Sequence, residues 1–344
     1  MSGTSLDGVD IAYCSFDYIN QNWSFQVIKA ETFPYSSAWK TRLSSVEKGT
    51  AQEFALTDIE YGKFLGTLTG EFIRKYDLCP DFIASHGHTI FHQPGKKFTC
   101  QIGKGSSIAS ETGYPVVCDF RSLDVALGGQ GAPLVPIGDR LLFSEFDFCL
   151  NLGGFANISY ENAGKRIAYD ICPVNIVLNH LAETVGKSYD RSGEMAGIGT
   201  LSPSLLAALD HLPYYQQKPP KSLGKEWILA NIYPLLESSS LRLNDQMNTF
   251  CEHIALQIAK ATSDSRPCRI LLTGGGTFND FLLERIKIHT RHQIVIPDDN
   301  TVNFKEAMIF AFLGLLRWRE EVNCLASVTG ASKGSIGGAI YLNQ

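Results

Sequence analysis

The chain has 344 residues, of which 44% are hydrophobic and 19% charged, and this length and composition are typical of a globular protein with two domains. A formal net charge of −5 without a basic cluster argues against a nucleic-acid surface, and no run of about 18 apolar residues suggests a membrane span. The first ten residues, MSGTSLDGVD, lack the basic and apolar regions of a secretory signal, and the nine cysteines include no Cys-x-x-Cys pair. We therefore expect a protein of the reduced cytoplasm that binds neither nucleic acid nor membrane.

The first half of the chain predicts strands interleaved with a long helix. A Gly/Ser/Thr-rich turn at 1–8 leads into an apolar strand, VDIAYCSF, and residues 51–75 have the periodicity of an amphipathic helix. DFIASHGHT predicts a buried strand that runs into a polar loop, and residues 114–120 predict another strand. The segment RSLDVALGGQGAPLVP then predicts a long irregular loop, which is too apolar to be disordered and is typical of a functional loop.

The second half predicts a hairpin followed by alternating helices and strands. Residues 146–160 contain two apolar runs joined by a Gly-rich turn, and residues 166–170 predict a third strand. Pro173 marks the first turn of a helix. Because strands alternate with helices, we expect an α/β fold. The remaining predicted elements are a strand at 268–272 and helices at 225–236, 248–262, 281–288 and 302–322.

Three Gly-rich turns, each next to a predicted strand, carry candidate phosphate-binding chemistry. In SGTSLDGVD, two glycines allow a tight turn, three hydroxyls can donate to phosphate oxygens, and Asp7 or Asp10 can hold Mg²⁺ directly or through water. The second turn is LGGFAN, and the third, TGGGTFN, lies where a nucleotide can approach a helix N-terminus. Each turn can also be merely structural, the first as a polar hairpin. The first two turns open the two halves of the chain and would place two phosphate-binding loops across one cleft.

Asp170 is the candidate catalytic carboxylate. It ends a predicted strand and precedes a helix, and this end of an open α/β sheet lines the ligand crevice, where a carboxylate can act as a general base. Asn175, in the first turn of that helix, can reach the same ligand. A helix N-cap explains an Asp at this position equally well.

A second polar cluster is formed by three histidines and an arginine. The spacing of His86, His88 and His92 does not place them on one face with Cys or carboxylate support, so it favours loop hydrogen bonds or sugar contact over zinc. Arg121 has a planar guanidinium that suits a carboxylate ligand. An internal ion pair with its neighbours Asp119 or Asp124 explains the same pattern, and the local sequence does not separate the two.

Nine segments, in this order, resemble the anhydro-N-acetylmuramic acid kinase family from the first residue to nearly the last. They are SGTSLDGVD, SHGHTIFHQP, QIGKGSSIASETGYPVVCDFRSLDVALGGQGAPLVP, LNLGGFANIS, DICPVN, YDRSGEMAGIG, LLTGGGTFNDFLLERI, KEAMIFAFLGLL and SVTGASKG. The resemblance implies the two-domain actin-like (ribonuclease H-like) fold of the acetate and sugar kinase, Hsp70 and actin superfamily, with an interdomain ATP and substrate cleft. It implies a first domain of residues 1–140 plus about 323–344, and a second domain of residues 141–322.

The resemblance also implies a reaction, cofactors and residue roles. Enzymes of the family hydrolyse the 1,6-anhydro ring of 1,6-anhydro-N-acetylmuramic acid and phosphorylate its 6-oxygen from ATP with Mg²⁺, giving N-acetylmuramic acid 6-phosphate and ADP in peptidoglycan recycling. Asp170 would activate the attacking water, and Asp7 and Asp10 would hold Mg²⁺ through water. We expect a cytoplasmic homodimer. The implied ATP-binding residues are Gly3, Thr4, Ser5, Leu6, Asp7, Gly8, Val9 and Asp10, then Gly153, Gly154 and Asn157, then Gly274, Gly275 and Gly276 beside the adenosine. The implied sugar-binding residues are His86, Arg121, Gln130, Asn175 and Glu306.

The chain departs from the family pattern at three points. DICPVN keeps Asp170, Pro173 and Asn175 where the family has DTGPGN, and His88 replaces the Gln of SHGQT. The family also carries an apolar strand before the first loop. We therefore expect a version of this chain that is extended upstream by one such strand to be more stable and to bind ATP more tightly.

Three other functions are compatible with parts of the pattern. A kinase for another carboxylated or amino sugar would differ only in its sugar loops, and a substrate screen would separate it. A nucleotide-driven binding protein of the Hsp70 or actin type needs a peptide-binding module or filament surfaces, and the sequence shows no appended module. A catalytically inactive relative would keep only sugar binding, but the presence of Asp170 and of all three Gly-rich turns favours the kinase.

Overall fold

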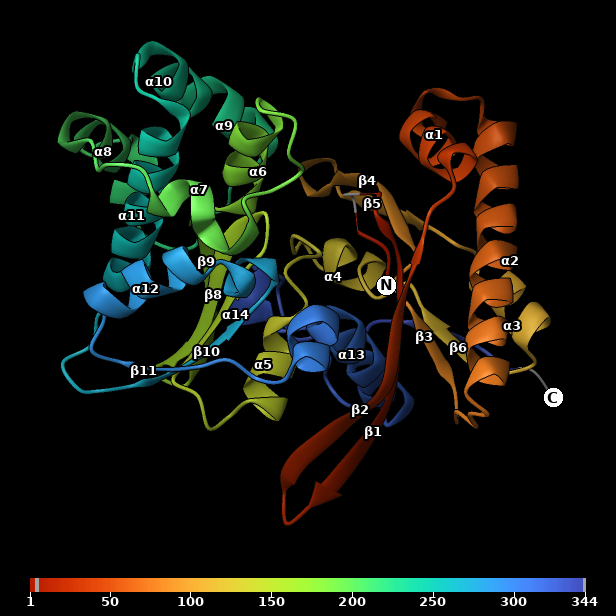
Figure 1. Ribbon diagram of the computed structural model, residues 1–344. Coiled ribbons are helices and arrows are strands. Elements are labelled where there is room, and N and C mark those ends of the chain that lie inside the picture. Colours follow the sequence, from red (N-terminus) through yellow and green to blue (C-terminus); the bar gives the residue numbers. More distant parts are fainter. Residues whose placement is uncertain (4–5, 343–344) are drawn as a thin grey trace. The chain divides into compact units, whose positions relative to one another are not determined.

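The computed structural model describes residues 1–3 and 6–342, so the predicted phosphate contacts of Thr4 and Ser5 lie outside the described residues (Figure 1). The chain forms two compact units. Unit 1 comprises Met1–Leu142 and Phe304–Gln344, and unit 2 comprises Phe143–Asn303. The return to unit 1 falls inside helix α13 (Asp299–Trp318), earlier than the expected position near 322.

The packing of α13 explains this early return. Phe312 of α13 contacts Phe16 and Trp23 of the first hairpin, with ring centroids 5.3 and 5.0 Å away. Phe312 is fully buried by these contacts and those around it. The helix therefore completes the core of unit 1 along most of its length.

Unit 2 is built on one five-stranded sheet in the order β11-β10-β7-β8-β9. β8 is antiparallel to both of its neighbours, whereas β10 is parallel to β7 and to β11. The α/β prediction is confirmed. The strands are β7 (Phe148–Leu152), β8 (Phe155–Asn162), β9 (Lys165–Pro173), β10 (Arg269–Thr273) and β11 (Gln293–Val295).

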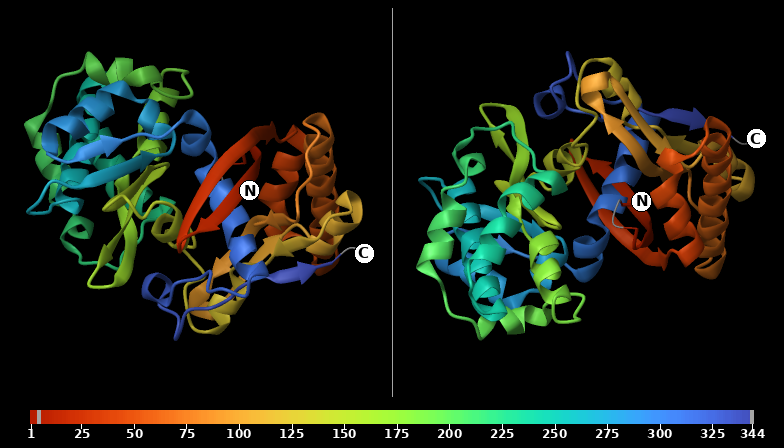
Figure 2. Two further views of the ribbon diagram at one scale, coloured as in Figure 1. Left: turned by 90° about the horizontal axis from the view of Figure 1, so that it is seen from below. Right: turned by 90° about the horizontal axis from the view of Figure 1, so that it is seen from above.

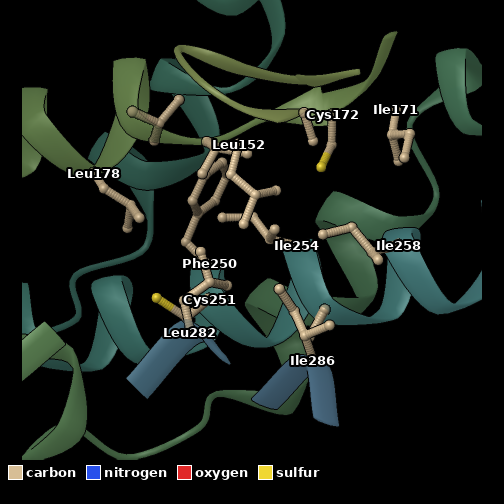
Figure 3. Close-up of a cluster of buried hydrophobic side chains, with 14 of the residues drawn as sticks. Leu152, Ile171, Cys172, Leu178, Phe250, Cys251, Ile254, Ile258, Leu282 and Ile286 are labelled. Carbon is tan, nitrogen blue, oxygen red and sulfur yellow. The ribbon is translucent and has the colours of Figure 1, made fainter. Parts of the chain in front are cut away.

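Helices of unit 2 cover the apolar face of this sheet. Figure 3 shows Leu152 of β7 and Cys172 of β9 beside Phe250 and Ile254 of α11 and Leu282 of α12, all of them fully buried. This core fixes the end of β7, where the second predicted phosphate loop begins. The helices are α6 (Asn175–Glu183), α7 (Glu194–Gly197), α8 (Pro203–Asp210), α9 (Lys225–Asn231), α10 (Tyr233–Ser238), α11 (Leu243–Ala261) and α12 (Asp280–His289), with 3-10 turns η3 (Arg191–Gly193), η4 (Pro213–Gln216) and η5 (Gly275–Phe278).

The strands of unit 1 form two hairpins and one small sheet. β1 pairs antiparallel with β2, β4 pairs antiparallel with β5, and the sheet has the order β12-β6-β3, with β3 parallel to β6. The predicted strand and loop at DFIASHGHT become β3 and the start of β4. The strands are β1 (Gly8–Ile19), β2 (Asn22–Pro34), β3 (Ile83–Ser85), β4 (His88–Gln93), β5 (Phe98–Ile102), β6 (Val116–Cys118) and β12 (Ala339–Tyr341).

Two long helices flank the β1–β2 hairpin, which Figure 2 shows between α13 and α2. The helix predicted at 51–75 is confirmed as α2, and a capping box between Thr50 and Glu53 explains its start. Among the described helices of the whole chain, none is both long and apolar enough to cross a membrane. The other helices of unit 1 are α1 (Ser37–Ser45), α3 (Gly105–Thr112), α4 (Ser122–Ala126), α5 (Pro136–Leu142) and α14 (Ala326–Thr329), with η1 (Val46–Lys48) and η2 (Pro94–Lys96).

Three predicted elements differ from the structure. Pro173 is the last residue of β9, and the helix after it begins at Asn175. The loop expected after Arg121 contains α4 and ends in α5. The single helix expected at 225–236 is divided into α9 and α10, because Pro234 lacks the N–H that a continuous helix needs. The nine cysteines are free thiols, and five of them are buried.

Candidate active site

The turn between β7 and β8 is joined by main-chain hydrogen bonds to the start of α6. The Val174 N–H donates to the Gly154 carbonyl at 2.8 Å, and the Asn175 N–H donates to the Gly153 carbonyl at 3.3 Å. The Asn175 side chain adds a bond from Nδ2 to the Leu152 carbonyl at 3.2 Å. The predicted second phosphate loop and Asn175 are therefore joined by hydrogen bonds. The family resemblance implies a different contact for Asn175, with the sugar.

The glycine triplet after β10 packs directly against the same turn. A Cβ on Gly274 would lie 2.6 Å from Asn151 Oδ1, and one on Gly276 would lie 2.7 Å from the Leu152 Cβ, so both positions require glycine. Gly274 also has a φ of +87°, which favours glycine. Gly275 is exposed, and a Cβ there would meet its nearest atom at 3.8 Å. The structure thus brings the second and third predicted turns together at one edge of the unit 2 sheet.

Asp170 lies on β9 directly opposite Asn157 of β8, so the two side chains share one face of the sheet. Its Oδ2 accepts a hydrogen bond from the Leu223 N–H at 2.9 Å, and its carbonyl accepts one from the Tyr214 hydroxyl at 2.5 Å. Burial raises the pKa of the Asp170 carboxyl, and the bond from Leu223 offsets part of this effect. A raised pKa makes the carboxylate a better proton acceptor.

The position of Asp170 rules out the helix N-cap interpretation. The N-cap position of α6 is Val174, which forms no side-chain capping bond, and Asp170 lies within β9. The Asp170 N–H donates to the Lys221 carbonyl at 3.3 Å, and the Lys221 ammonium lies 4.4 Å from the centroid of the Tyr214 ring. The segment 214–223 therefore covers Asp170. Sequence reasoning missed this segment because its hydrogen bonds to Asp170 span 44 and 53 residues.

Three side chains from other parts of unit 1 form a hydrogen-bonded chain with Ser2 of the first predicted phosphate loop. Ser2 Oγ lies 2.8 Å from His88 Nδ1 and 2.6 Å from the Tyr35 hydroxyl, which in turn lies 2.5 Å from the Tyr61 hydroxyl. Burial raises the pKa of Tyr35 and lowers the pKa of His88, so both side chains stay uncharged near neutral pH. His88, the departure from the family pattern, is thus a support for the loop rather than a metal ligand.

The remaining described residues of this loop differ in exposure. Gly3 is exposed, its carbonyl accepts the Leu6 N–H at 3.4 Å, and Leu6 has a φ of +59°. Val9 is buried. Gly8 has no room for a side chain, because a Cβ would lie 2.4 Å from the carbonyl oxygen of Phe33. The loop is therefore pinned where it enters β1.

Asp7 and Asp10 are the predicted Mg²⁺ ligands. Asp7 is exposed, and Asp10 Oδ1 accepts a hydrogen bond from the Thr32 hydroxyl at 2.6 Å. No group of three or more His, Cys, Asp or Glu within the described residues is placed to hold a metal ion. Mg²⁺ often takes only one or two carboxylates when phosphates and waters supply its other ligands. The two aspartates therefore fit an ion that arrives with a nucleotide, and they do not form a metal centre of their own.

Arg121 binds His86 rather than its two neighbouring aspartates. Its Nε donates to His86 Nε2 at 2.9 Å, and its Nη1 donates to the Gly131 carbonyl at 2.6 Å. Because Nε2 accepts, the proton of His86 lies on Nδ1, which contacts the Gly87 carbonyl at 3.0 Å. Burial, together with the charge of Arg121, holds the pKa of His86 well below its ordinary value. Neither the zinc interpretation nor the local ion pair is found among the described residues.

Two residues of α13 lie beside this pair. The ring of Phe310 has its centroid 4.6 Å from that of His86 and 5.9 Å from the guanidinium carbon of Arg121. Glu306, one helical turn earlier, is exposed and attracts Arg121 electrostatically. Gln130 is exposed, and its N–H donates to the Thr329 carbonyl at 2.9 Å. The structure brings three of the predicted sugar-binding residues together, His86, Arg121 and Glu306.

Asp124 organises the loop after Arg121, a role that sequence reasoning missed. It is fully buried, its Oδ2 accepts the Gly131 N–H at 2.7 Å, and its Oδ1 accepts the Thr329 hydroxyl at 2.7 Å and the Cys324 thiol at 3.0 Å. A Cβ on Gly129 would lie 2.2 Å from Asp124 Oδ2. The closely spaced glycines of GGQG were the local signal, but the partners in the C-terminal segment lie 200 and 205 residues away.

Comparison with known proteins assigns the family. The model of the family described as anhydro-N-acetylmuramic acid kinase matches residues 1–343. The chain belongs to the anhydro-N-acetylmuramic acid kinase family. It is therefore a kinase, as the resemblance predicted.

Individual relatives align with this chain over almost their whole length. The anhydro-N-acetylmuramic acid kinase of Sulfurovum sp. (strain NBC37-1) is 35% identical over 361 residues, which cover 99% of this chain and 98% of the relative. The anhydro-N-acetylmuramic acid kinase of Vibrio vulnificus (strain YJ016) is 33% identical over 367 residues, which cover 99% of this chain and 96% of the relative. A ROK family glucokinase structure from Streptomyces griseus is 10% identical, covers 83% of this chain and 94% of its own, and has a TM-score of 0.35, which adds nothing to the assignment.

Proposed function

We propose that this kinase hydrolyses the 1,6-anhydro ring of 1,6-anhydro-N-acetylmuramic acid and phosphorylates its 6-oxygen, with ATP as the phosphoryl donor. The products are N-acetylmuramic acid 6-phosphate and ADP. One observation carries the proposal: in unit 2, the Gly153–Gly154 turn, Asn175 and the Gly274–Gly276 triplet converge in a chain whose family is described as anhydro-N-acetylmuramic acid kinase.

The Gly-rich turns are the proposed ATP-binding elements. Gly153, Gly154 and Asn157 would contact phosphate oxygens, and the glycine triplet would border the adenosine. The close packing of Gly274 and Gly276 on Leu152 supports a shared site, since it leaves the backbone of the triplet near the phosphate turn. In unit 1, the described residues Gly3 and Leu6–Asp10 would form the other phosphate loop.

Mg²⁺ would be held by Asp7 and Asp10, directly or through water, together with phosphate oxygens. The ion would neutralise charge that develops during phosphoryl transfer. The accessible carboxylates of Asp7 and Asp10 support this role.

Asp170 is the proposed general base. Water attacks the anomeric carbon, Asp170 accepts a proton from that water, and the bond between the anomeric carbon and the 6-oxygen breaks. The released 6-oxygen takes the γ-phosphoryl group of ATP, and ADP leaves. The raised pKa of the Asp170 carboxyl supports this role, because it favours proton transfer from water.

The residues proposed to bind the sugar belong to unit 1, except for Asn175 of unit 2. Arg121 would bind the carboxylate of the sugar's lactyl group, because a guanidinium binds a carboxylate with two parallel hydrogen bonds. His86 supports this by accepting from Nε of Arg121, which orients the guanidinium. Glu306, Gln130 and Asn175 are proposed as hydroxyl or amide contacts.

The decisive experiment incubates the purified chain with ATP, Mg²⁺ and the anhydro-sugar in water enriched in ¹⁸O. We expect N-acetylmuramic acid 6-phosphate with one ¹⁸O at the anomeric carbon in a promptly quenched sample, detected by mass spectrometry. The ring-opened sugar N-acetylmuramic acid serves as the matched control acceptor. Equal phosphorylation of both sugars, or an unlabelled product, would contradict coupled ring hydrolysis and favour a kinase for another amino sugar.

The cellular setting is part of the same proposal. We place the enzyme in the cytoplasm, in peptidoglycan recycling, as a homodimer. Membership of the family supports this setting. Sedimentation velocity would test the homodimer, and a monomer at micromolar concentration would contradict it.

A further inference from the structure

Asp170 lies on β9 beside a β-bulge and at one edge of the unit 2 sheet. The register of the β8–β9 pair shifts between Ala156 and Asn157, so that Ile171 is the extra residue on β9. A bulge bends its strand and can re-aim the side chain beside it. In the order β11-β10-β7-β8-β9, β9 has no further strand beside it among the described residues. Strand pairing on one side alone therefore fixes the Asp170 carboxylate less closely than it would in a regular central strand.

The segment 214–223 supplies the hydrogen bonds on the free side of β9, and we call this segment the strap. It contacts Asp170 through three residues. The Asp170 N–H donates to the Lys221 carbonyl at 3.3 Å, and the Asp170 carbonyl accepts from the Tyr214 hydroxyl at 2.5 Å. Oδ2 of the side chain accepts from the Leu223 N–H at 2.9 Å. The strap therefore satisfies both main-chain groups of Asp170 and one oxygen of its carboxylate, as a further strand could not.

Lys221 joins the two ends of the strap. Its ammonium donates to the Tyr214 carbonyl at 3.1 Å and lies 4.4 Å from the centroid of the Tyr214 ring, where the π-electrons attract a cation. The Tyr214 ring also packs against Trp227 of α9, with centroids 5.4 Å apart. The strap is thus closed on itself, and the hydroxyl of Tyr214 is held at the main chain of β9.

Tyr215, the next residue along the chain, provides a matched comparison. Tyr214 and Tyr215 are both buried, and each side chain packs against Trp227. The ring of Tyr215 also contacts His253 of α11, with centroids 4.8 Å apart. Its hydroxyl has no hydrogen-bond partner within the described part of the chain, whereas the hydroxyl of Tyr214 donates to Asp170. The two neighbouring tyrosines therefore differ in whether the hydroxyl bonds the candidate catalytic residue.

We infer that Tyr214 is a positioning residue for the reaction proposed above, with Lys221 holding it in place. Within the described residues, hydrogen bonds to the Asp170 carboxylate reach Oδ2 alone, from the Leu223 N–H. Oδ1 is therefore the oxygen left to accept the proton of the attacking water. Tyr214 bonds the main chain of Asp170 and not its carboxylate, so it acts by setting the direction in which Oδ1 points. The inference rests on the proposed function, in which Asp170 is the general base.

The test compares Tyr214→Phe with Tyr215→Phe. Each variant removes one hydroxyl from a buried ring, but only Tyr214→Phe removes a bond to Asp170. We expect Tyr214→Phe to lower kcat for sugar phosphorylation about 3–10-fold, as the loss of one hydrogen bond does, and to leave KM for ATP unchanged. Tyr215→Phe should keep both constants. Hydrogen exchange of the Asp170 and Leu223 amides, followed by NMR, should be faster in Tyr214→Phe alone.

Lys221→Met tests the closure of the strap by a second route. Methionine keeps an apolar chain of similar length against the Tyr214 ring but cannot donate to the Tyr214 carbonyl, so kcat should fall and the Leu223 amide should exchange faster. Lys221→Arg should restore both, because a guanidinium can donate to the same carbonyl and stack on the same ring. Lys218→Met, at an exposed lysine that makes none of these contacts, is the control and should change neither.

Two results would overturn the inference. One is equal kcat and equal amide exchange in Tyr214→Phe and Tyr215→Phe. The other is faster exchange in Tyr214→Phe without a fall in kcat, which would make Tyr214 a structural residue only. Failure of the proposed function has a different signature, since the unmodified enzyme would then leave the anhydro-sugar unphosphorylated. In that case the role of Tyr214 in the reaction falls with it, while exchange of the Leu223 amide still reports whether Tyr214 holds the strap.

Discussion

The two Gly-rich loops that begin the two halves of the chain are held in different ways. In unit 2, main-chain bonds link the Gly153–Gly154 turn to α6, and the turn sits between two strands of one sheet. In unit 1, main-chain bonds join Met1 to Asp10 and Asp7 to Tyr35, and side-chain bonds from Ser2 to His88 and Tyr35 add to them. Both loops are therefore sensitive to added Cβ atoms, and the unit 1 loop is sensitive in addition to the loss of single polar side-chain atoms.

Two carboxylates, Asp124 of unit 1 and the half-buried Asp170 of unit 2, also differ in their contacts. Asp124 in unit 1 accepts three hydrogen bonds and joins two distant segments, so its role is structural. Asp170 in unit 2 has a raised pKa and shares a sheet face with the exposed Asn157. The two aspartates thus differ in the hydrogen bonds that their carboxylate oxygens accept, and this difference can be tested.

The largest expected effect is the loss of turnover in Asp170→Asn. Removing a positioned base typically lowers the rate by about 10²–10⁴-fold. We expect this loss in kcat for sugar phosphorylation, with ATP affinity by calorimetry and the folded state by circular dichroism retained. Asp264→Asn, at an exposed loop of the same unit, is the matched control and should keep full activity. Turnover near that of the unmodified enzyme would remove Asp170 from the mechanism.

The next largest effect is a loss of stability on substitution of Gly274 in the glycine triplet, for which Gly275 is the matched control. Gly274→Ala places a Cβ 2.6 Å from Asn151 Oδ1 at a φ of +87°, so we expect a loss of about 1–3 kcal/mol in the free energy of unfolding. Gly275→Ala adds the same atom one residue later, where the nearest contact is 3.8 Å away. Urea unfolding should separate the two variants, and equal stability would show that the turn does not depend on this packing.

Local patterns in the sequence predicted most helices and strands. They could not predict the hydrogen bonds of the candidate site, which join residues that are far apart in the chain. α2 begins where a capping box and an apolar stripe coincide, and both signals lie within 25 residues. The Ser2–His88 bond spans 86 residues and the bond from Arg121 to His86 spans 35. The tertiary fold brings such partners together, and the residues next to them in the sequence carry no signal of the pairing. The edge strands β11 and β12 were not predicted, because three residues are too few to show a periodic pattern.

The third prediction concerns Asp124, the structural counterpart of Asp170. Asp124→Asn replaces one acceptor oxygen with a donor, which leaves a partner in the buried cluster of Gly131, Thr329 and Cys324 without its bond. We expect a loss of about 1–3 kcal/mol in stability, because an unsatisfied buried donor or acceptor costs this much. We also expect a raised KM for the sugar, since Gly131 accepts from Arg121. An unchanged melting temperature would contradict a structural role for this carboxylate.

The smallest expected effect is a pH-dependent gain of stability in Asp170→Asn. Burial raises the pKa of the folded Asp170 above its unfolded value, so the folded state binds this proton more tightly than the unfolded state. The stability of the unmodified enzyme therefore falls as pH rises from the unfolded pKa through the folded pKa, and above that window the ionised carboxylate is a net cost. Asn stays neutral, and its Oδ1 can still accept from the Leu223 N–H. We expect Asp170→Asn to melt slightly higher than the unmodified enzyme near neutral pH, and the difference to vanish in acid. The acid limb of the activity profile should lie in the same window, because the proton acceptor is lost there. If Asp170→Asn melts lower at neutral pH, burial does not raise the pKa of this carboxyl, and its surroundings serve to stabilise the charge instead.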